Sequence, residues 1–246
     1  MMKYVAQLEY LGTNYNGWQK QKHLSSTIQT IVEDALSQVF SEQINTICAG
    51  RTDAGVHARC QIVNFESKNQ RSINAILLGV NGLLPPDISF KSARIIENDD
   101  FNARFSARLR HYKYLIYNAP TKSPLQFNRA LWCHMPLDIN AMNLAANYLL
   151  GENDFSAFRS RYCQARNTYR TVYSIDITRD NEFICIDLKA NAFLHSMVRK
   201  IVGSLLLVGQ VKKEPVWLKE VLDSKDRSKS GRTAEACGLY LWDVEY

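Results

Sequence analysis

Strand-like and helix-like segments follow each other in the same order in both halves of this chain, and that repetition restricts the folds open to it. Residues 3–10 alternate between apolar and polar side chains as a strand does, and residues 26–40 place apolar side chains on one helix face. In the second half, residues 111–118 alternate in the same way, and residues 140–151 show helical spacing closed by Gly151. We therefore expect an α+β fold of two related lobes, with ferredoxin-like β/α order, mixed and mainly antiparallel sheets, helices on one face and a central cleft.

Other segments extend this pattern. A helix from residue 74 should end at the prolines of residues 85–86, and Ser25 to Thr27 offer an N-cap for the helix at 26–40. The polar stretch at residues 98–106 divides the chain into an N-terminal lobe, residues 1–104, and a C-terminal lobe, residues 105–246. Further strands are expected at residues 44–50, 61–67 and 238–246, a hairpin at 171–178 and 183–190, and helices at 195–209 and 215–224.

Composition excludes several classes of protein. With 46% hydrophobic and 22% charged residues, a chain of 246 residues can bury a sizeable core. The first residues lack the basic and apolar regions of a secretory signal, and the apolar stretch at residues 197–211 is too short and too charged to span a bilayer. The six cysteines are scattered without a C-x-x-C pair, so we expect reduced thiols, no metal site and a cytoplasmic protein without membrane contact.

The positive charge of the chain is concentrated in two runs. The net charge is +6, and residues 103–113 and 159–170 each hold four basic residues and no acidic one. The second run also contains Tyr162 and Tyr169. Arginines with interleaved tyrosines suit the neutralisation of phosphates and the stacking of bases, so we expect a nucleic-acid partner, although a solvated basic face would look the same.

The sequence CAGRTDAGVHARC, residues 48–60, offers a candidate for chemistry. Asp53 follows a predicted strand and precedes Gly55, which permits a sharp turn with positive φ. One interpretation is an Asx turn in which Asp53 only caps the backbone. The other is that Asp53, with Arg51 and His57 in the same loop, is held out for reaction. An aspartate kept ionised by arginines is a poor general base at neutral pH but a permanent nucleophile.

Several ordered motifs resemble those of the tRNA pseudouridine synthase A family. The sequence G-R-T-D-A-G-V-H-A carries the family signature, and similar segments run in order from about residue 4 to the C-terminus. They lie at residues 10–21, 78–88, 100–108, 112–118, 149–159, 189–203 and 238–241.

The resemblance implies an isomerase that converts uridine to pseudouridine at positions 38, 39 and 40 of the tRNA anticodon arm, without a metal or an organic cofactor. It implies that Asp53 is the nucleophile, attacking either C6 of the uracil or C1′ of its ribose, and that Arg199 pairs with Asp53. Tyr112 would stack on the target base and could take the last proton, while Leu239 would line the base pocket. By helical pattern alone, Arg199 would be a solvent residue. Leu239 could equally be an ordinary core residue of the closing strand.

The resemblance also implies a homodimer that holds one tRNA in its clefts, with the central cleft of the fold binding RNA. Arg51 is expected to touch the RNA or the flipped nucleotide, and His57 and His195 are assigned positioning or packing but no chemical step. The other expected RNA contacts are Arg108, Arg110, Arg159, Arg166 and Arg170.

Two other functions fit part of the sequence. A glycosidic-bond hydrolase would need a second carboxylate as general acid, which the Asp53 stretch lacks, and it would release free uracil. An RNA-binding or chaperone module would use Asp53 only as a turn residue, so that replacing it would leave every RNA activity intact.

Overall fold

The computed structural model describes residues 1–21, 26–97 and 100–246, and these residues form two compact units. The first unit comprises Met1–Arg108 and Leu241–Tyr246, and the second comprises Leu109–Tyr240. Among the described residues, no helix has both the length and the apolar character needed to cross a membrane.

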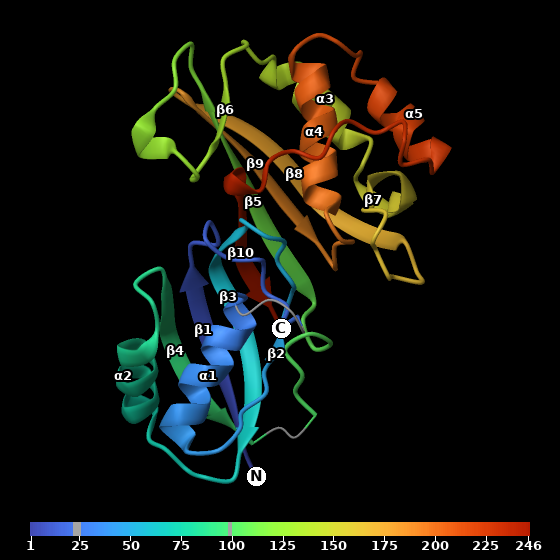
Figure 1. The fold of residues 1–246 in the computed structure, drawn as a ribbon. Coiled ribbons are helices and arrows are strands. Elements are labelled where there is room, and N and C mark those ends of the chain that lie inside the picture. The colour runs from blue at the N-terminus through green and yellow to red at the C-terminus, as the bar shows by residue number, and fades with distance from the viewer. Residues whose placement is uncertain (22–25, 98–99) are drawn as a thin grey trace. The chain divides into compact units, whose positions relative to one another are not determined.

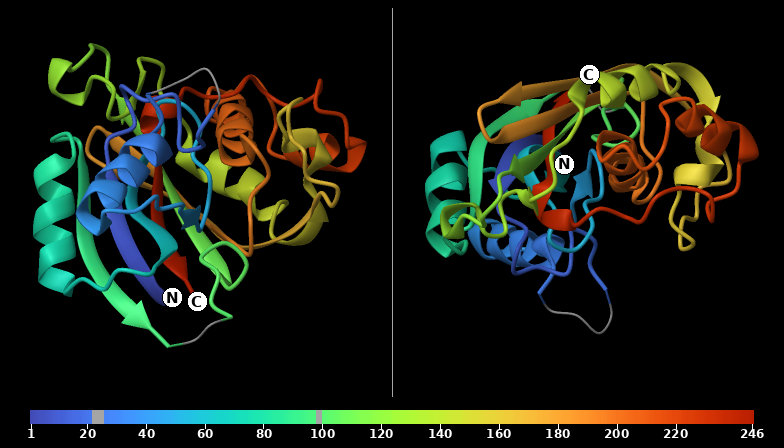
Figure 2. Two further views of the ribbon diagram at one scale, coloured as in Figure 1. Left: turned by 60° about the horizontal axis from the view of Figure 1, so that its bottom comes forward. Right: turned by 90° about the horizontal axis from the view of Figure 1, so that it is seen from above.

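The first unit is an antiparallel sheet with two helices (Figure 1). Strand β1 pairs with β3 on one side and with β4 on the other, and β2 adds two residues to β3. Helix α1 packs against α2, and α2 against β4 (Figure 2). The elements are β1 Met2–Tyr10, α1 Ile28–Phe40, β2 Ile47–Cys48, β3 His57–Ser67, α2 Ile73–Leu83 and β4 Ile88–Ile96.

An aromatic cluster joins α1 to the sheet of the first unit. Tyr4 of β1 stacks on Phe65 of β3 with the ring centroids 5.2 Å apart, and it meets the edge of Phe40 of α1 at 5.3 Å. All three rings are almost fully buried, which makes them a main part of this core. Thr27 caps α1 as predicted by accepting from the N–H of Thr30, whereas Ser25 lies outside the described residues.

The strand expected at residues 44–50 is reduced to the two residues of β2. Side chains of α1 bind the backbone donors that a longer strand would use. The hydroxyl of Ser37 accepts from the N–H of Ile44 at 2.9 Å, and Oε1 of Glu33 accepts from the N–H of Thr46 at 2.9 Å. The apolar pattern of this stretch reflects burial against α1 rather than pairing in the sheet.

The second unit is built around β5, which pairs with β9 antiparallel and with the short β6 parallel, while β8 joins β9 to β7. Helices α3 and α4 pack against each other, and α3 against β8 (Figure 1). The elements are β5 Leu109–Asn118, β6 Leu131–Cys133, α3 Ile139–Asn147, β7 Gly151–Asp154, β8 Tyr169–Asp180, β9 Phe183–Ala190, α4 Met197–Gly209, α5 Trp217–Ser224 and β10 Leu239–Glu245, whose last residues belong to the first unit.

The predicted α+β class with mainly antiparallel strands is confirmed, as is the β8–β9 hairpin. The prediction that Gly151 closes a helix at residues 140–151 is wrong. Helix α3 ends at Asn147, because Tyr148 and the two residues after it bond to carbonyls three residues earlier, which tightens the chain into a narrower turn. Gly151, with φ +84°, instead begins β7.

Candidate functional site

Asp53 lies in a tight turn between β2 and β3. The N–H of Val56 donates to the Asp53 carbonyl at 3.1 Å, and Gly55 supplies the positive φ of +78° that closes the turn. The N–H of Gly55 donates to the Tyr15 carbonyl at 3.3 Å. An Asx turn at Asp53 would use the N–H groups of Gly55 and Val56, and both already donate to main-chain carbonyls. The Asp53 side chain is half-buried, and Thr52 before it is buried.

The loop between β1 and α1 lies directly against this turn. The N–H of Trp18 donates to the Thr52 carbonyl at 3.0 Å. Gly17 has φ +83°, and a Cβ there would come within 2.7 Å of the Thr52 carbonyl oxygen. A Cβ on Gly12 would come within 1.9 Å of the Val56 carbonyl oxygen. The glycines of the 10–21 motif are therefore needed for backbone-to-backbone packing on the Asp53 turn.

A buried polar network holds the start of the turn. The side-chain amide of Gln61 donates to the Gly50 carbonyl at 2.6 Å and accepts from the Gly50 N–H at 3.4 Å. Its Nε2 also donates to the Tyr10 hydroxyl at 3.4 Å, and that hydroxyl lies 2.8 Å from the hydroxyl of Thr52. Gln61 is fully buried, so these bonds are shielded from water and fix the backbone on both sides of Arg51.

His57 has a structural contact in this site. Its ring is fully buried, and Nδ1 accepts a hydrogen bond from the N–H of Gly12 at 2.9 Å. An accepting Nδ1 carries no proton, so the ring that makes this bond is neutral. His57 thereby joins β3 to the loop that contacts the turn, in agreement with a positioning role. His195, the other histidine for which we expect positioning or packing, is exposed.

Positive charge surrounds the base of the turn. Burial raises the pKa of the Cys48 thiol to about 12, while the charges of Arg51 and Arg104 oppose that rise. Both arginines therefore lie close enough to Cys48 to act on it, and both are exposed. The first unit thus presents a half-buried carboxylate on a braced turn with arginines beside it.

Tyr112, Tyr114 and Ile116 share one face of β5 in the second unit, as predicted. Tyr114 and Ile116 are fully buried, and Tyr112 is 8% exposed. The Tyr112 ring meets Phe193 edge-on with the centroids 5.0 Å apart. The hydroxyl of Tyr114 donates to the Glu235 carbonyl at 2.8 Å, which ties β5 to the segment before β10.

Arg199 lies in the first turn of α4 and is half-buried rather than a solvent residue as its helical position suggested. Its Nε donates to the Ala234 carbonyl at 2.7 Å, and the N–H of Ala234 returns a bond to the Arg199 carbonyl at 3.0 Å. Burial raises the pKa of Tyr114, and the charge of Arg199 opposes this rise, so Arg199 lies near the Tyr112 face of β5.

Leu239 is 6% exposed and follows Gly238, the last residue of a short 3-10 helix. A Cβ on Gly238 would lie 2.6 Å from the Leu115 carbonyl oxygen and 2.7 Å from Cε1 of Tyr114. The absence of a side chain at Gly238 therefore lets the start of β10 lie directly against β5.

The arginines expected to bind RNA differ in exposure. Arg108 and Arg166 are exposed, and Arg159 and Arg170 are half-buried. Arg110 is only 9% exposed, and its Nη1 donates to the Asn191 carbonyl at 2.8 Å. Arg110 therefore has a structural contact within the second unit. For the half-buried Arg170, burial lowers the pKa of the guanidinium.

The predicted site residues fall in both units. Asp53 and Arg51 belong to the first unit, and Tyr112, Arg199 and Leu239 to the second. Sequence reasoning did not single out Gly12, Gly17 or Gln61; the two glycines were visible only as members of the 10–21 motif. Over the described part of the chain, no group of three or more His, Cys, Asp and Glu side chains is arranged to hold a metal ion.

Comparison with known proteins agrees with the ordered motifs. A family model described as tRNA pseudouridine synthase matches residues 6–106 and 145–246. The "tRNA pseudouridine synthase A" of Francisella tularensis subsp. novicida is 47% identical over 246 residues, covering 100% of this chain and 95% of that protein. The protein of the same name from Colwellia psychrerythraea is 45% identical over 245 residues, 100% of this chain and 94% of its own length.

A solved structure, "Crystal Structure of a Cbf5-Nop10-Gar1 Complex", shares 12% identity over 82% of this chain and 45% of that chain, with a TM-score of 0.37. The two full-length relatives and the family model are sufficient for the assignment. The chain belongs to the tRNA pseudouridine synthase family.

Proposed function

We propose that this protein isomerises uridine to pseudouridine at positions 38, 39 and 40 of the tRNA anticodon arm. The observation that carries the proposal is the Asp53 turn of a chain in the tRNA pseudouridine synthase family. Its backbone is fixed by Tyr10, Gln61 and the glycine loop, while the carboxylate is half-buried. A rigid turn of this kind places a nucleophile without an entropic cost at the moment of reaction.

Asp53 acts as the nucleophile of the proposed reaction. Its carboxylate attacks C1′ of the ribose, or alternatively C6 of the uracil, and the bond between N1 and C1′ breaks. The uracil turns, C5 forms a bond to C1′, and the aspartate is released. The proton on C5 is lost and N1 gains a proton. The product is an isomer of the substrate, so the reaction consumes no cofactor and no energy source.

Residues of the second unit support the nucleophile. We assign Arg199 to pair with Asp53 and to keep it ionised, because its Nε is already held by the Ala234 carbonyl and the guanidinium is therefore oriented. In this proposal Tyr112 stacks on the target base and accepts the C5 proton, and Leu239 lines the base pocket.

The target uridine must leave the base stack before Asp53 can reach it, at a cost of a few kcal/mol. Contacts to phosphates offset this cost. Arg51, Arg108 and Arg166 are exposed and suit this role, together with the half-buried Arg159 and Arg170. Arg110 would first have to give up its bond to Asn191.

We also infer a homodimer that holds one tRNA and acts in the cytoplasm. The first inference rests on membership of the family, and the second on the scattered cysteines of the sequence. Sedimentation of the protein with and without tRNA tests the first, because one tRNA per two chains is expected.

The experiment that tests the function follows tritium release from tRNA transcripts labelled at C5 of uracil. Three transcripts each keep a single uridine in the anticodon arm, at position 38, 39 or 40. Wild-type protein should release tritium from all three and form pseudouridine at the labelled position. Asp53→Asn, which keeps the shape of the side chain but not its charge, should bind the same tRNAs and release none.

Asp34→Asn is the matched control, because Asp34 is an exposed aspartate of α1 in the same unit. It should behave as the wild type. Equal release by Asp53→Asn would remove Asp53 from the chemistry. Free uracil in place of pseudouridine would identify a glycosidic-bond hydrolase, and binding without any release by the wild type would leave an RNA-binding module.

A further inference from the structure

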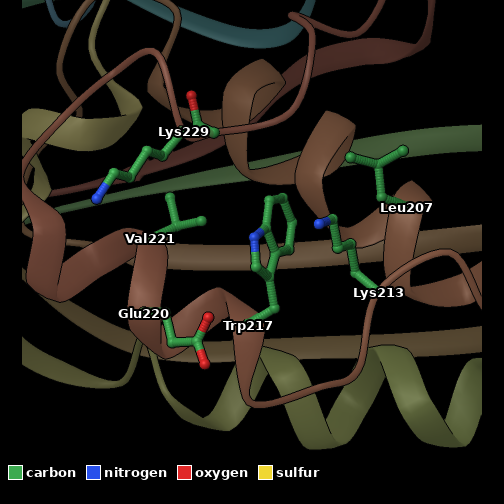
Figure 3. A pocket seen from close by; sticks show the side chains of 7 residues that line it. Leu207, Lys213, Trp217, Glu220, Val221 and Lys229 are labelled. Atoms are coloured by element: carbon green, nitrogen blue, oxygen red, sulfur yellow. The ribbon is translucent and has the colours of Figure 1, made fainter.

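We propose that the second unit carries a further RNA-contact pocket, which binds a nucleotide of the tRNA other than the target uridine. The pocket is formed by the end of α4 and the segment after it, by α5, and by Lys229 and Ser230 of the basic run at residues 224–232 (Figure 3). The proposal rests on the proposed function, because it takes tRNA to be the substrate.

The end of the basic run, residues 230–232, is anchored to α4, while residues 225–229 before it are exposed. The N–H of Gly231 donates to the hydroxyl of Ser204 at 2.9 Å, and Nζ of Lys200 donates to Oγ of Ser230 at 3.1 Å and to the Gly231 carbonyl at 3.3 Å. A Cβ on Gly203 would come within 1.7 Å of the Arg232 carbonyl oxygen. This packing fixes the backbone next to Lys229 on the surface of α4.

The pocket combines an indole ring with two lysines. Its volume is about 400 Å³. Trp217 stands in its middle, with Lys213 on one side and Val221 on the other (Figure 3). Nζ of Lys213 lies 5.3 Å from the centroid of the Trp217 ring. The lining residues are Leu207, Lys213, Trp217, Glu220, Val221, Lys229 and Ser230.

The two lysines of the pocket form no salt bridge with a described carboxylate, whereas two neighbouring lysines do. Within the described residues, neither Lys213 nor Lys229 lies within 4.0 Å of a carboxylate oxygen. Nearby on α5, Lys219 pairs with Asp223 at 2.6 Å. Just after α5, Lys225 pairs with Asp154 at 3.5 Å.

A further lysine lies beside the pocket, because Nζ of Lys200 donates to Oγ of Ser230 in its lining. Burial and the charge of Arg227 both lower the pKa of Lys200, which shows that Arg227 is close to it. Against these charges stand Glu220, the one carboxylate in the lining, and Asp226, whose pKa is lowered by hydrogen bonds from Ser228 and by the nearby charges of Lys229 and Arg227. The balance around the pocket is therefore positive, and it favours an anionic ligand.

These groups match the parts of a nucleotide. Ammonium groups neutralise phosphates, an indole offers a face and an N–H donor to a base, and a carboxylate accepts from the exocyclic or ring N–H of a base. A protein partner would need a larger apolar surface than Leu207, Trp217 and Val221 provide. The positive balance selects RNA over a protein partner.

The position of the pocket along α4 separates it from the candidate catalytic residues. Arg199 lies in the first turn of α4 and Leu207 in the last, eight residues later. At about 1.5 Å per residue this separation is about 12 Å along the helix axis. A nucleotide in the pocket is therefore not the one that reaches Arg199, and the ligand is another part of the tRNA.

The double variant Lys213→Ala/Lys229→Ala tests the proposal, with binding of unmodified tRNA measured at several salt concentrations. Its Kd should rise about tenfold, and the slope of log Kd against log salt should fall by about 2, one for each lost phosphate contact. Tritium release should show the loss in KM rather than in kcat. Lys213→Arg/Lys229→Arg keeps both charges and should restore binding.

The matched control is Lys219→Ala/Lys225→Ala, which removes two lysines paired with carboxylates and should leave Kd within about twofold of the wild type. Equal effects of the two double variants would overturn the proposal, because they would reflect net charge alone. An unchanged Kd for Lys213→Ala/Lys229→Ala would overturn it as well. If that variant lost binding of adenosine monophosphate but kept tRNA binding, the pocket would be a free-nucleotide site.

The proposed function fails in a different way. If the wild-type protein releases no tritium, or if Asp53→Asn releases it normally, the proposed reaction at Asp53 is refuted. This holds whatever the slope of log Kd against log salt is. A change of slope in Lys213→Ala/Lys229→Ala concerns only the pocket.

Discussion

Replacing Gly17 by alanine tests whether the loop between β1 and α1 holds the Asp53 turn in place. Gly17 has φ +83°, and its new Cβ would lie 2.7 Å from the Thr52 carbonyl oxygen and 3.1 Å from the Ala54 nitrogen. Both neighbours are backbone atoms, so the turn itself must move. The left-handed conformation costs a non-glycine residue about 1–2 kcal/mol, and relief of an overpacked contact costs about 1–3 kcal/mol more.

Gly151 provides a control that separates these two costs. Its φ of +84° is nearly the same, but a Cβ there meets nothing within 4 Å. Gly151→Ala should therefore lower the free energy of unfolding by about 1–2 kcal/mol, through backbone conformation alone. Gly17→Ala should lower it by about 1–3 kcal/mol more than that, measured by urea unfolding of both variants.

Activity gives the second half of this test. A displacement of the turn by even about 1 Å can reduce kcat by up to roughly a hundredfold, because the nucleophile is then misplaced. Tritium release at saturating tRNA should therefore fall for Gly17→Ala and remain at the wild-type level for Gly151→Ala. Equal losses of stability in the two variants, with kcat unchanged in both, would refute the claim that the close approach of Gly17 positions Asp53.

Three further changes test other contacts. Gln61→Leu should cost about 1–3 kcal/mol in the free energy of unfolding and should reduce kcat, because Gly50 loses both of its side-chain partners; urea unfolding and tritium release measure the two effects. Hydrogen bonds from Ser67 and the backbone lower the pKa of Glu42. The wild type should therefore have a higher free energy of unfolding than Glu42→Gln at pH 7, and urea unfolding should show this difference disappear as the pH falls below about 4. Gly238→Ala should raise KM for tRNA and lower stability, because its Cβ would meet the backbone of β5, and steady-state kinetics with thermal unfolding would detect both.

The sequence predicted those elements whose pattern reflects burial on one face. The spacing of Ile28, Val32, Leu36 and Phe40 predicts α1, and each of these residues is fully buried. The strand at 44–50 was overestimated because the same apolar pattern arises when side chains of a helix, rather than a neighbouring strand, satisfy the backbone. Periodicity reports which side chains are buried but not which groups bind the main chain.

The candidate site shows the same limit. The sequence indicates Asp53 and Arg51 because they stand together in one loop with His57, in a motif that resembles the family signature. Gln61 could not be found, because a glutamine in an alternating strand is expected to face solvent, and nothing in the sequence indicates that its amide binds Gly50, eleven residues earlier. Arg199 was judged by its helical face, although the segment at Ala234 covers that side of α4.

The bonds around Asp53 allow its charge and its position to be tested separately. The N–H groups of Gly55 and Val56 already donate to main-chain carbonyls, so the turn is closed by the backbone. Asp53→Asn should therefore keep the turn and remove the charge, with stability near that of the wild type and no tritium release. Gly17→Ala should keep the charge and displace the turn, with lower stability and reduced release. If a turn cap were the only role of Asp53, Asp53→Asn would keep both the stability and the tritium release of the wild type, because asparagine caps such turns as well as aspartate does.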